Sequence, residues 1–130
     1  MRVVIVESPF AGDVERNTRY ARAALLDCLK RDEAPFASHL LYTQVLDDTA
    51  LHERARGIAA GLELAKRADL TAVYSDLGIS RGMQMGIDAA HAAGRAVEYR
   101  SLPGWIERYD EEPPIVGNCF NCGAPISERL

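Results

Sequence analysis

Two acidic side chains come directly after apolar segments of the chain. Glu7 follows the β-branched residues 3–6, and Asp76 follows the apolar segment 70–75. If these segments are parallel strands, both acids lie beyond carboxyl ends of strands, where open α/β sheets bind their ligands. Two carboxylates in one cleft can perform acid/base catalysis or stabilise an oxocarbenium ion, as at glycosidic bonds. Turn formation and helix capping are the alternative roles of these acids.

A glycine-containing segment after Asp76 favours an anionic ligand. Residues 78–82 read Gly-Ile-Ser-Arg-Gly and lead into a predicted helix. Ser80 can cap that helix or bind an oxyanion, Arg81 offers a fork of donors, and Gly82 leaves room for a ligand at the backbone. A helix N-terminus also presents free N–H groups and partial positive charge to a phosphate or carboxylate. In the alternative interpretation, Ser80 is only an N-cap and Arg81 only a surface charge.

A second segment of the same kind begins at Glu7. Residues 7–12 contain a Pro and a Gly and also lead into a predicted helix. Asn17 falls on the buried stripe of that helix, so its amide needs partners, either backbone groups of residues 7–12 or hydroxyls of a ligand. His39 lies in an apolar stretch, either as a structural histidine or as a ligand contact. The candidate ligand-binding residues are therefore Ser8, Pro9, Phe10, Ala11, Gly12, Asn17, His39, Ser80, Arg81, Gly82, Met83 and Gln84, with Glu7 and Asp76 as candidate catalytic residues.

The spacing of apolar residues predicts the elements that position these segments. Strands are expected at 3–6, 70–75 and 96–100, helices at 14–31, about 51–65 and about 80–93, and a short strand or ordered loop at 35–43. Asp47, Asp48 and Thr49 supply negative charge and capping oxygens for the helix that follows them. The alternation of strands and helices predicts an α/β protein with a three-layer, doubly wound parallel sheet of four to five strands, as in flavodoxin-like and Rossmann-like folds.

The helix predicted at 80–93 has two different faces. Its small-residue face, which permits close approach to the sheet, consists of Gly82, Gly86, Ala89 and Ala93. Its polar face, most simply a solvated one, consists of Gln84, Asp88, His91 and Arg95.

Composition limits the class of protein. A chain of 130 residues fits one domain, and a net charge of -4 argues against a nucleic-acid partner. No apolar run reaches the roughly 20 residues that span a bilayer, and the apolar start of the chain is too short for a signal peptide, because it ends at Glu7. Three cysteines without a secretory signal argue against a disulfide framework. We therefore expect a cytoplasmic protein without a membrane partner.

Two blocks of this sequence resemble the nucleoside 2-deoxyribosyltransferase-like superfamily. The first is residues 4–12, Val-Ile-Val-Glu-Ser-Pro-Phe-Ala-Gly, followed by Asn17 and Ala21 in a helix. The second is Ala68-Asp69, a strand, Asp76, Ser80-Arg81-Gly82-Met83 and Gly94-Arg95-Ala96-Val97. The resemblance covers about residues 1–100 and is greatest to bacterial and phage members without an assigned activity.

This resemblance implies a ligand and an activity. The superfamily includes nucleoside deoxyribosyltransferases and nucleoside 5′-monophosphate N-glycosidases. By resemblance, Phe10 and Gly12 contact the base or sugar, Asp76 the sugar, and Ser80 with Gly82 a 5′-phosphate. The implied function is hydrolysis or base exchange at the N-glycosidic bond of a nucleoside or its 5′-monophosphate, in a homodimer or higher homo-oligomer.

The sequence also departs from the superfamily pattern. Active members carry a nucleophilic Glu early in the third helix, and the matching position here is Gly86 or Gln84, depending on the alignment. Phe10 lacks the hydroxyl that a Tyr would supply. Either Glu7, Asp76 or a residue of a partner subunit performs the chemistry, or the protein binds a nucleotide without cleaving it, as a sensor or a sequestering protein.

The chain divides into an α/β domain at residues 1–102 and a C-terminal extension at 103–130. The extension contains Cys119-Phe120-Asn121-Cys122-Gly123, which resembles one knuckle of a zinc ribbon. Because a structural zinc site needs four ligands, Cys119 and Cys122 form a site shared between two chains, a redox pair or an inert remnant. No cofactor is expected for the chemistry itself.

Overall fold

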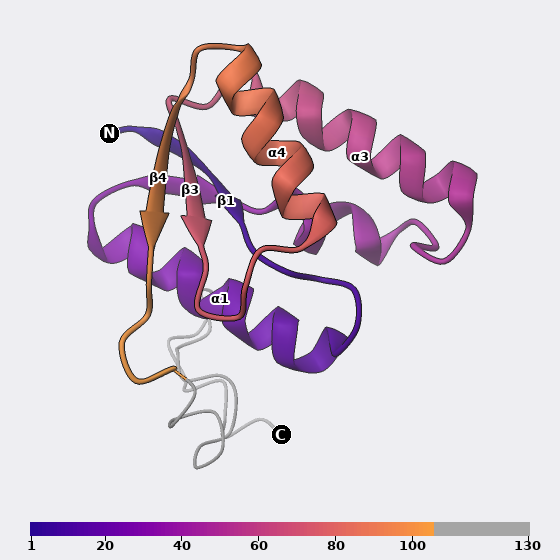
Figure 1. Ribbon diagram of the computed structural model, residues 1–130, viewed down its shortest axis with the longest axis horizontal. Coiled ribbons are helices and arrows are strands. Elements are labelled where there is room, and N and C mark those ends of the chain that lie inside the picture. The colour runs from indigo at the N-terminus through magenta and orange to yellow at the C-terminus, as the bar shows by residue number, and fades with distance from the viewer. Residues whose placement is uncertain (106–130) are drawn as a thin grey trace, which may run out of the picture.

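The β-branched run near the start of the chain forms the first of four parallel strands. The computed structural model describes residues 1–105. Strands β1 (Val3–Glu7), β2 (Ala34–Phe36), β3 (Leu70–Tyr74) and β4 (Ala96–Arg100) pair in the order β2-β1-β3-β4. All three pairings are parallel, with Glu7 opposite Val73. The predicted doubly wound parallel sheet is therefore confirmed (Figure 1).

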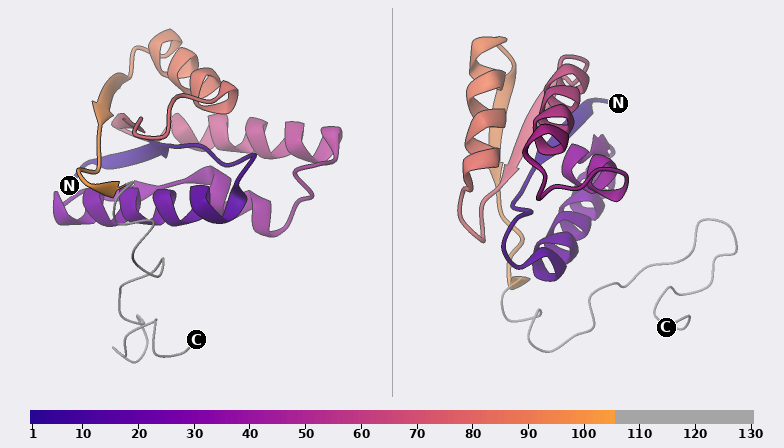
Figure 2. Two further views of the ribbon diagram at one scale, coloured as in Figure 1. Left: turned by 60° about the horizontal axis from the view of Figure 1, so that its bottom comes forward. Right: turned by 90° about the vertical axis from the view of Figure 1, so that its right-hand side faces the viewer.

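Helices cover both faces of this sheet. Helix α1 (Val14–Lys30) lies on one face, and helices α3 (Leu51–Ala65) and α4 (Arg81–Ala92) lie on the other (Figure 2). A short helix α2 (Ser38–Leu41) and a 3-10 turn η1 (Tyr42–Gln44) connect β2 to α3. None of the helices within residues 1–105 is both long enough and apolar enough to cross a bilayer.

Alternation along β1 sends its side chains to two different environments. Val4 and Val6 are buried in the cluster that includes Tyr20 of α1. Because successive side chains of a strand point to opposite faces, Ile5 and Glu7 point toward α3 and α4. The last residue of β1 therefore places a carboxyl between the sheet and these two helices.

Helices α1 and α4 both begin at a residue whose side chain caps the helix, and the cap of α4 is the predicted Ser80. The Asp13 carboxylate accepts a hydrogen bond from the Arg16 backbone N–H (3.1 Å), and Ser80 Oγ accepts one from the Met83 N–H (3.2 Å). These bonds satisfy donors that a helix start otherwise leaves unpaired. Both caps follow a glycine-containing turn, so each turn ends at a helix N-terminus.

The segment between β2 and α3 differs from the prediction. Helix α3 has Ala50 at its N-cap, without a side-chain cap hydrogen bond. The Asp47 carboxylate instead accepts hydrogen bonds from the Thr49 N–H (2.9 Å) and the Thr49 hydroxyl (2.6 Å). The predicted capping of α3 by Asp47 and Thr49 is therefore wrong, because both residues are used in a local turn before the helix.

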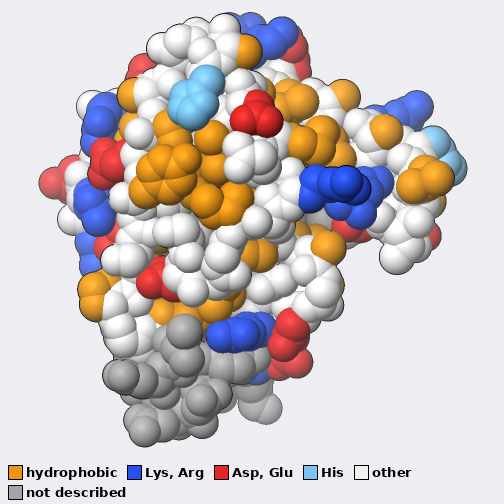
Figure 3. Space-filling view, viewed as in Figure 1, with side chains coloured by type: hydrophobic (Ala, Val, Ile, Leu, Met, Phe, Trp, Pro, Cys, Tyr) orange, Lys and Arg blue, Asp and Glu red, His pale blue; other side chains and the backbone are white. Residues whose placement is uncertain are grey.

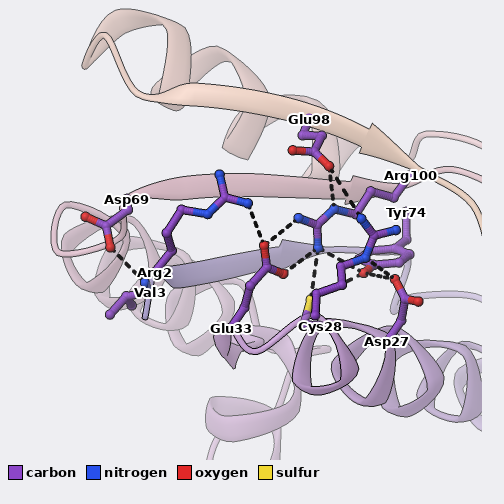
Figure 4. A network of polar contacts seen from close by, with 10 residues as sticks. Arg2, Val3, Asp27, Cys28, Glu33, Asp69, Tyr74, Glu98 and Arg100 are labelled. Atoms are coloured by element: carbon purple, nitrogen blue, oxygen red, sulfur yellow. Dashed lines mark hydrogen bonds and ion pairs between the residues drawn. The ribbon is translucent and has the colours of Figure 1, made fainter.

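A buried ion pair ties the end of β4 to the start of β2 (Figure 4). The Arg100 guanidinium donates to both Glu33 oxygens (2.7 and 2.8 Å), and Arg2 donates to Glu33 Oε2 (2.8 Å). The Glu33 and Arg100 side chains are only 4% and 2% exposed. The hydrogen bonds from Arg100 hold the pKa of Glu33 below its ordinary value. The ion pair thus joins the two edge strands, β2 and β4, on the α1 side of the sheet.

The C-terminal extension is described only at its start. Trp105 packs edge-to-face on Tyr20 of α1, with ring centroids 5.3 Å apart. Cys119 and Cys122, for which a shared zinc site, a redox pair and an inert remnant were the alternatives, lie outside the described residues. Cys28 of α1 is buried in the core, where its sulfur contacts the Tyr74 hydroxyl (3.3 Å) and accepts a hydrogen bond from Arg100 Nη1 (3.4 Å).

Candidate functional site

Both glycine-containing segments open onto one cavity. The cavity measures about 260 Å³ and lies on the side of the sheet covered by α3 and α4. Ser8, Phe10 and Ala11 line it from the segment after β1. Ser80, Arg81, Gly82 and Met83 line it from the segment that starts α4. Candidate residues separated by about seventy positions in the sequence therefore share one site.

Glu7 is the acid at the sheet side of this cavity. Its side chain is half-buried, and no residue within 1–105 hydrogen-bonds to its carboxyl group. Burial raises the pKa of Glu7 from its ordinary value of 4.5 to about 8, against the opposing charge of Arg95. At neutral pH the carboxyl group is consequently protonated and can act as a proton donor.

Arg95 supplies a cation to the same cavity. It follows the turn after α4, and its Nε donates to Thr71 Oγ1 on β3 (2.9 Å). This bond directs the guanidinium toward the sheet, so the expected solvated position of Arg95 is wrong. The sequence feature that indicates this position is Gly94. Its φ of 69° ends the helix, so Arg95 no longer lies on the polar helix face.

A neutral histidine forms part of the cavity wall. His39 Nε2 lies 2.8 Å from Ser8 Oγ, and burial lowers the pKa of His39 from 6.5 to about 4. The imidazole is therefore uncharged at neutral pH. Phe10 meets the His39 ring edge-to-face, with centroids 6.4 Å apart. Together these rings offer a neutral, largely apolar surface to a planar ligand group.

Asp76 is absent from the cavity lining and is bound elsewhere. Its carboxylate accepts hydrogen bonds from the Tyr20 hydroxyl (2.5 Å) and from the Leu102 backbone N–H (2.8 Å). The Tyr20 oxygen in turn accepts the Asp76 N–H (2.9 Å). Burial, with this carboxylate beside it, raises the pKa of Tyr20. Asp76 therefore holds the chain after β4 against α1. The two candidate acids, Glu7 and Asp76, do not lie in one site.

The other candidate residues fall into two groups. Asn17 donates to the backbone oxygens of Phe10 (2.9 Å) and Ala11 (3.1 Å), which is the first of its two predicted alternatives. Asn17 thereby holds the loop in shape, and it is absent from the cavity lining. Pro9, Gly12 and Gln84 are also outside the cavity lining, and Gln84 donates to Asp88 along the exposed side of α4 (2.9 Å).

The opposite wall of the cavity consists of residues that the sequence did not single out. Arg54, Gly57 and Ile58 of α3 line it, with Tyr42 and Leu46 before that helix. Basic side chains gather where the start of α4 approaches α3, and apolar side chains gather over α4 and β4 (Figure 3). The sequence feature that indicates this wall is Gly57, a glycine inside a helix. A Cβ at position 57 would lie 3.3 Å from Leu46 Cδ1, so the helix comes close to Leu46 there.

Comparison with known proteins supports this architecture. A family model described as "Domain of unknown function (DUF7768)" matches residues 2–100. The chain belongs to the DUF7768 family. No curated protein matches this DUF7768 chain. Within residues 1–105, no three His, Cys, Asp or Glu side chains are grouped to hold a metal ion.

Two solved structures are similar to the DUF7768 domain. One is a 2-deoxyribosyltransferase from Bacillus psychrosaccharolyticus, with 18% sequence identity and a TM-score of 0.62, covering 76% of this chain and 72% of that enzyme. The other is the CMP N-glycosidase BcmB of Clostridium botulinum, with 12% identity and a TM-score of 0.46, covering 85% of this chain and 96% of that protein. The first similarity shows that the fold is shared.

The raised pKa of Glu7 predicts a stability effect that depends on pH. A carboxyl whose folded pKa lies above its unfolded value stabilises the native state below pH 4.5, and this stabilisation is lost as the pH rises through about 8. Glu7→Gln removes the ionisable group without changing its shape. We expect the variant to unfold at a higher temperature than the wild type at pH 9 and at nearly the same temperature at pH 4, by calorimetry. An equal difference in Tm at both pH values would show that Glu7 titrates normally.

Proposed function

We propose that this domain cleaves the N-glycosidic bond of a nucleoside or its 5′-monophosphate, by hydrolysis or by exchange of the base. One observation carries the proposal: a carboxyl group with a pKa of about 8 faces a cavity large enough for part of a nucleotide. A base leaves a sugar far more readily when it is protonated as the bond breaks. Glu7 holds such a proton at neutral pH.

The proposed step uses Glu7 as a general acid. As the bond between the anomeric carbon and the base nitrogen breaks, its electron pair leaves with the base, and the base takes the Glu7 proton. A water oxygen forms the new bond to the anomeric carbon, and the proton of that water passes to solvent. Solvent then reprotonates Glu7. In base exchange, a nitrogen of the incoming base takes the place of the water.

The rest of the cavity supports the two ends of such a ligand. Phe10 and the neutral His39 offer a surface for a base. Ser80 and Arg81 stand at the start of α4, where a helix N-terminus favours a phosphate. The shared fold with a nucleoside-processing enzyme supports this class of substrate. Dimerisation and a zinc site at Cys119 and Cys122 remain predictions.

Product analysis tests the proposal directly. The purified full chain is incubated with nucleosides and their 5′-monophosphates, with ribose and with deoxyribose, and free base is measured by chromatography. We expect release of more base than there is protein, from at least one substrate. Recovery of intact nucleotide with a raised Tm, and no free base, would contradict cleavage and instead support the sensor or sequestering function.

A further inference from the structure

A glycine of α4 lies directly against the acid of the cavity. A Cβ on Gly86 would lie 2.3 Å from Glu7 Oε2, 2.5 Å from Cδ and 2.8 Å from Oε1. All three distances are shorter than a carbon atom can approach. The Glu7 carboxyl group therefore occupies the volume that any side chain at position 86 would enter first.

We propose that Gly86 is a positioning residue for Glu7, and that positions 7 and 86 are alternative anchors for one acid in this cavity. The proposal rests on the proposed function for its catalytic part only. Its structural part is that the missing side chain at position 86 leaves the space in which the Glu7 carboxyl group lies, a space that we call the seat. This part depends only on the close contact between Gly86 and Glu7.

The position of Gly86 in the helix supports this role. Gly86 is buried in the interior of α4, between Met83 and Ile87 on the face toward the sheet. Glycine is the least favourable residue after proline inside a helix, so its presence there needs a packing reason. Close contact with the Glu7 carboxyl is the reason that the structure offers.

Shape, not hydrogen bonding, holds the carboxyl group in place. No residue within 1–105 hydrogen-bonds to it, so the fit between β1 and α4 is what keeps it out of solvent. Displacing the group toward the cavity mouth would restore its hydration and lower its pKa toward the ordinary value. A side chain at position 86 therefore changes the ionisation of Glu7 by displacing its carboxyl group, without forming a hydrogen bond or an ion pair with it.

The two positions also approach one volume from opposite sides. Glu7 enters it from the sheet, and a side chain at position 86 would enter it from α4. Both Glu7 and Gly86 line the cavity, so a longer side chain from position 86 has space to extend once Glu7 is truncated. An acid moved from β1 to α4 is thus expected to remain within the site.

A set of alanine variants tests the seat without any activity. We expect Gly86→Ala to lower the Tm, although alanine is the better helix former, and to lower the Glu7 pKa in a carboxyl NMR titration of the full chain. In the Glu7→Ala background the same Gly86→Ala change is expected to raise the Tm. Gly82→Ala is the matched control, because its Cβ would meet only Ser80 Oγ at 4.0 Å, and it should leave the Glu7 pKa unchanged.

A positional exchange tests the catalytic part. We expect Glu7→Ala/Gly86→Glu to release base at least about tenfold faster than Glu7→Ala, because a general acid contributes about 10²–10⁴-fold and even an imperfectly placed one restores part of it. A folded exchange variant no faster than Glu7→Ala, beside an active wild type, would overturn the alternative anchors. A Gly86→Ala variant with unchanged Tm and Glu7 pKa would overturn the seat.

Failure of the proposed function gives a different pattern from failure of this inference. If no substrate yields free base with the wild type, cleavage is excluded, and the alanine variants still decide the seat through Tm and pKa. If the exchange variant does not fold, the reversal in sign of the Gly86→Ala effect on Tm decides the proposal: reversal supports it, and equal effects in both backgrounds overturn it.

Discussion

Glu7→Gln is expected to reduce kcat for base release by about 10²–10⁴-fold, the contribution of a positioned general acid. The amide keeps the size of the side chain and its place against Gly86 but has no acidic proton. Because the change removes an interaction made as the base departs, kcat and kcat/KM should fall together, with little change in KM. Steady-state release of free base by wild type and variant measures this effect.

The same substitution at an exposed acid is the matched control. Glu63 lies on α3 in a surface ion pair with Lys66, outside the cavity lining, so Glu63→Gln should retain the wild-type rate. Glu7→Asp, which keeps the acid but withdraws it from its seat, should have an intermediate rate. A Glu7→Gln enzyme as fast as Glu63→Gln would remove Glu7 from the mechanism.

Glu33→Ala is expected to destabilise the protein by about 3–5 kcal/mol, the effect of breaking a buried ion pair. The substitution leaves Arg100, whose side chain is only 2% exposed, with a single remaining ion pair to the partly exposed Glu98 (3.0 Å). Glu33 also receives the Arg2 hydrogen bond from the start of β1, so the loss affects this central strand as well as the two edge strands that the Glu33–Arg100 pair joins (Figure 4). Urea unfolding monitored by circular dichroism measures the change in free energy.

Removing both charges separates the ion pair from the packing. In Glu33→Met/Arg100→Met, the apolar side chains fill similar volume without a buried charge, so the double variant should be clearly more stable than Glu33→Ala. The low pKa of Glu33 also means that its contribution is present above the unfolded value and is lost as the pH falls through the lower folded value. A Glu33→Ala variant within about 1 kcal/mol of wild type would mean that the remaining pair with Glu98 is enough to compensate the Arg100 charge.

Much of the fold was predictable because local patterns and tertiary structure agree. The β-branched run of β1, the caps Asp13 and Ser80 and the glycine that ends α4 each specify their element from neighbouring residues alone. The rule that ligands bind beyond the carboxyl ends of parallel strands then correctly brought together the segments that contain Phe10 and Arg81. Each of these inferences needs only short-range information.

The remaining features depend on which residues meet in space. Glu7 ends β1 and Asp76 follows β3, but only Asp76 is bound by the Tyr20 hydroxyl, which lies more than fifty residues away in sequence. The contact between Glu7 and Gly86 joins a strand to a helix that packs on it, so neither residue signals it alone. The cavity wall formed by α3 was not predicted for the same reason. Gly57 indicates that another residue comes close to the helix, but not which residue.

The pH dependence of kcat/KM for base release tests the central claim most directly. A protonated Glu7 as general acid predicts a rate that holds through neutral pH and then falls about tenfold per pH unit above pH 8. Glu7→Gln should lack this decline in its residual rate. A wild-type rate that rises through pH 8, or one unaffected by it, would show that the working group is not the protonated carboxyl of Glu7.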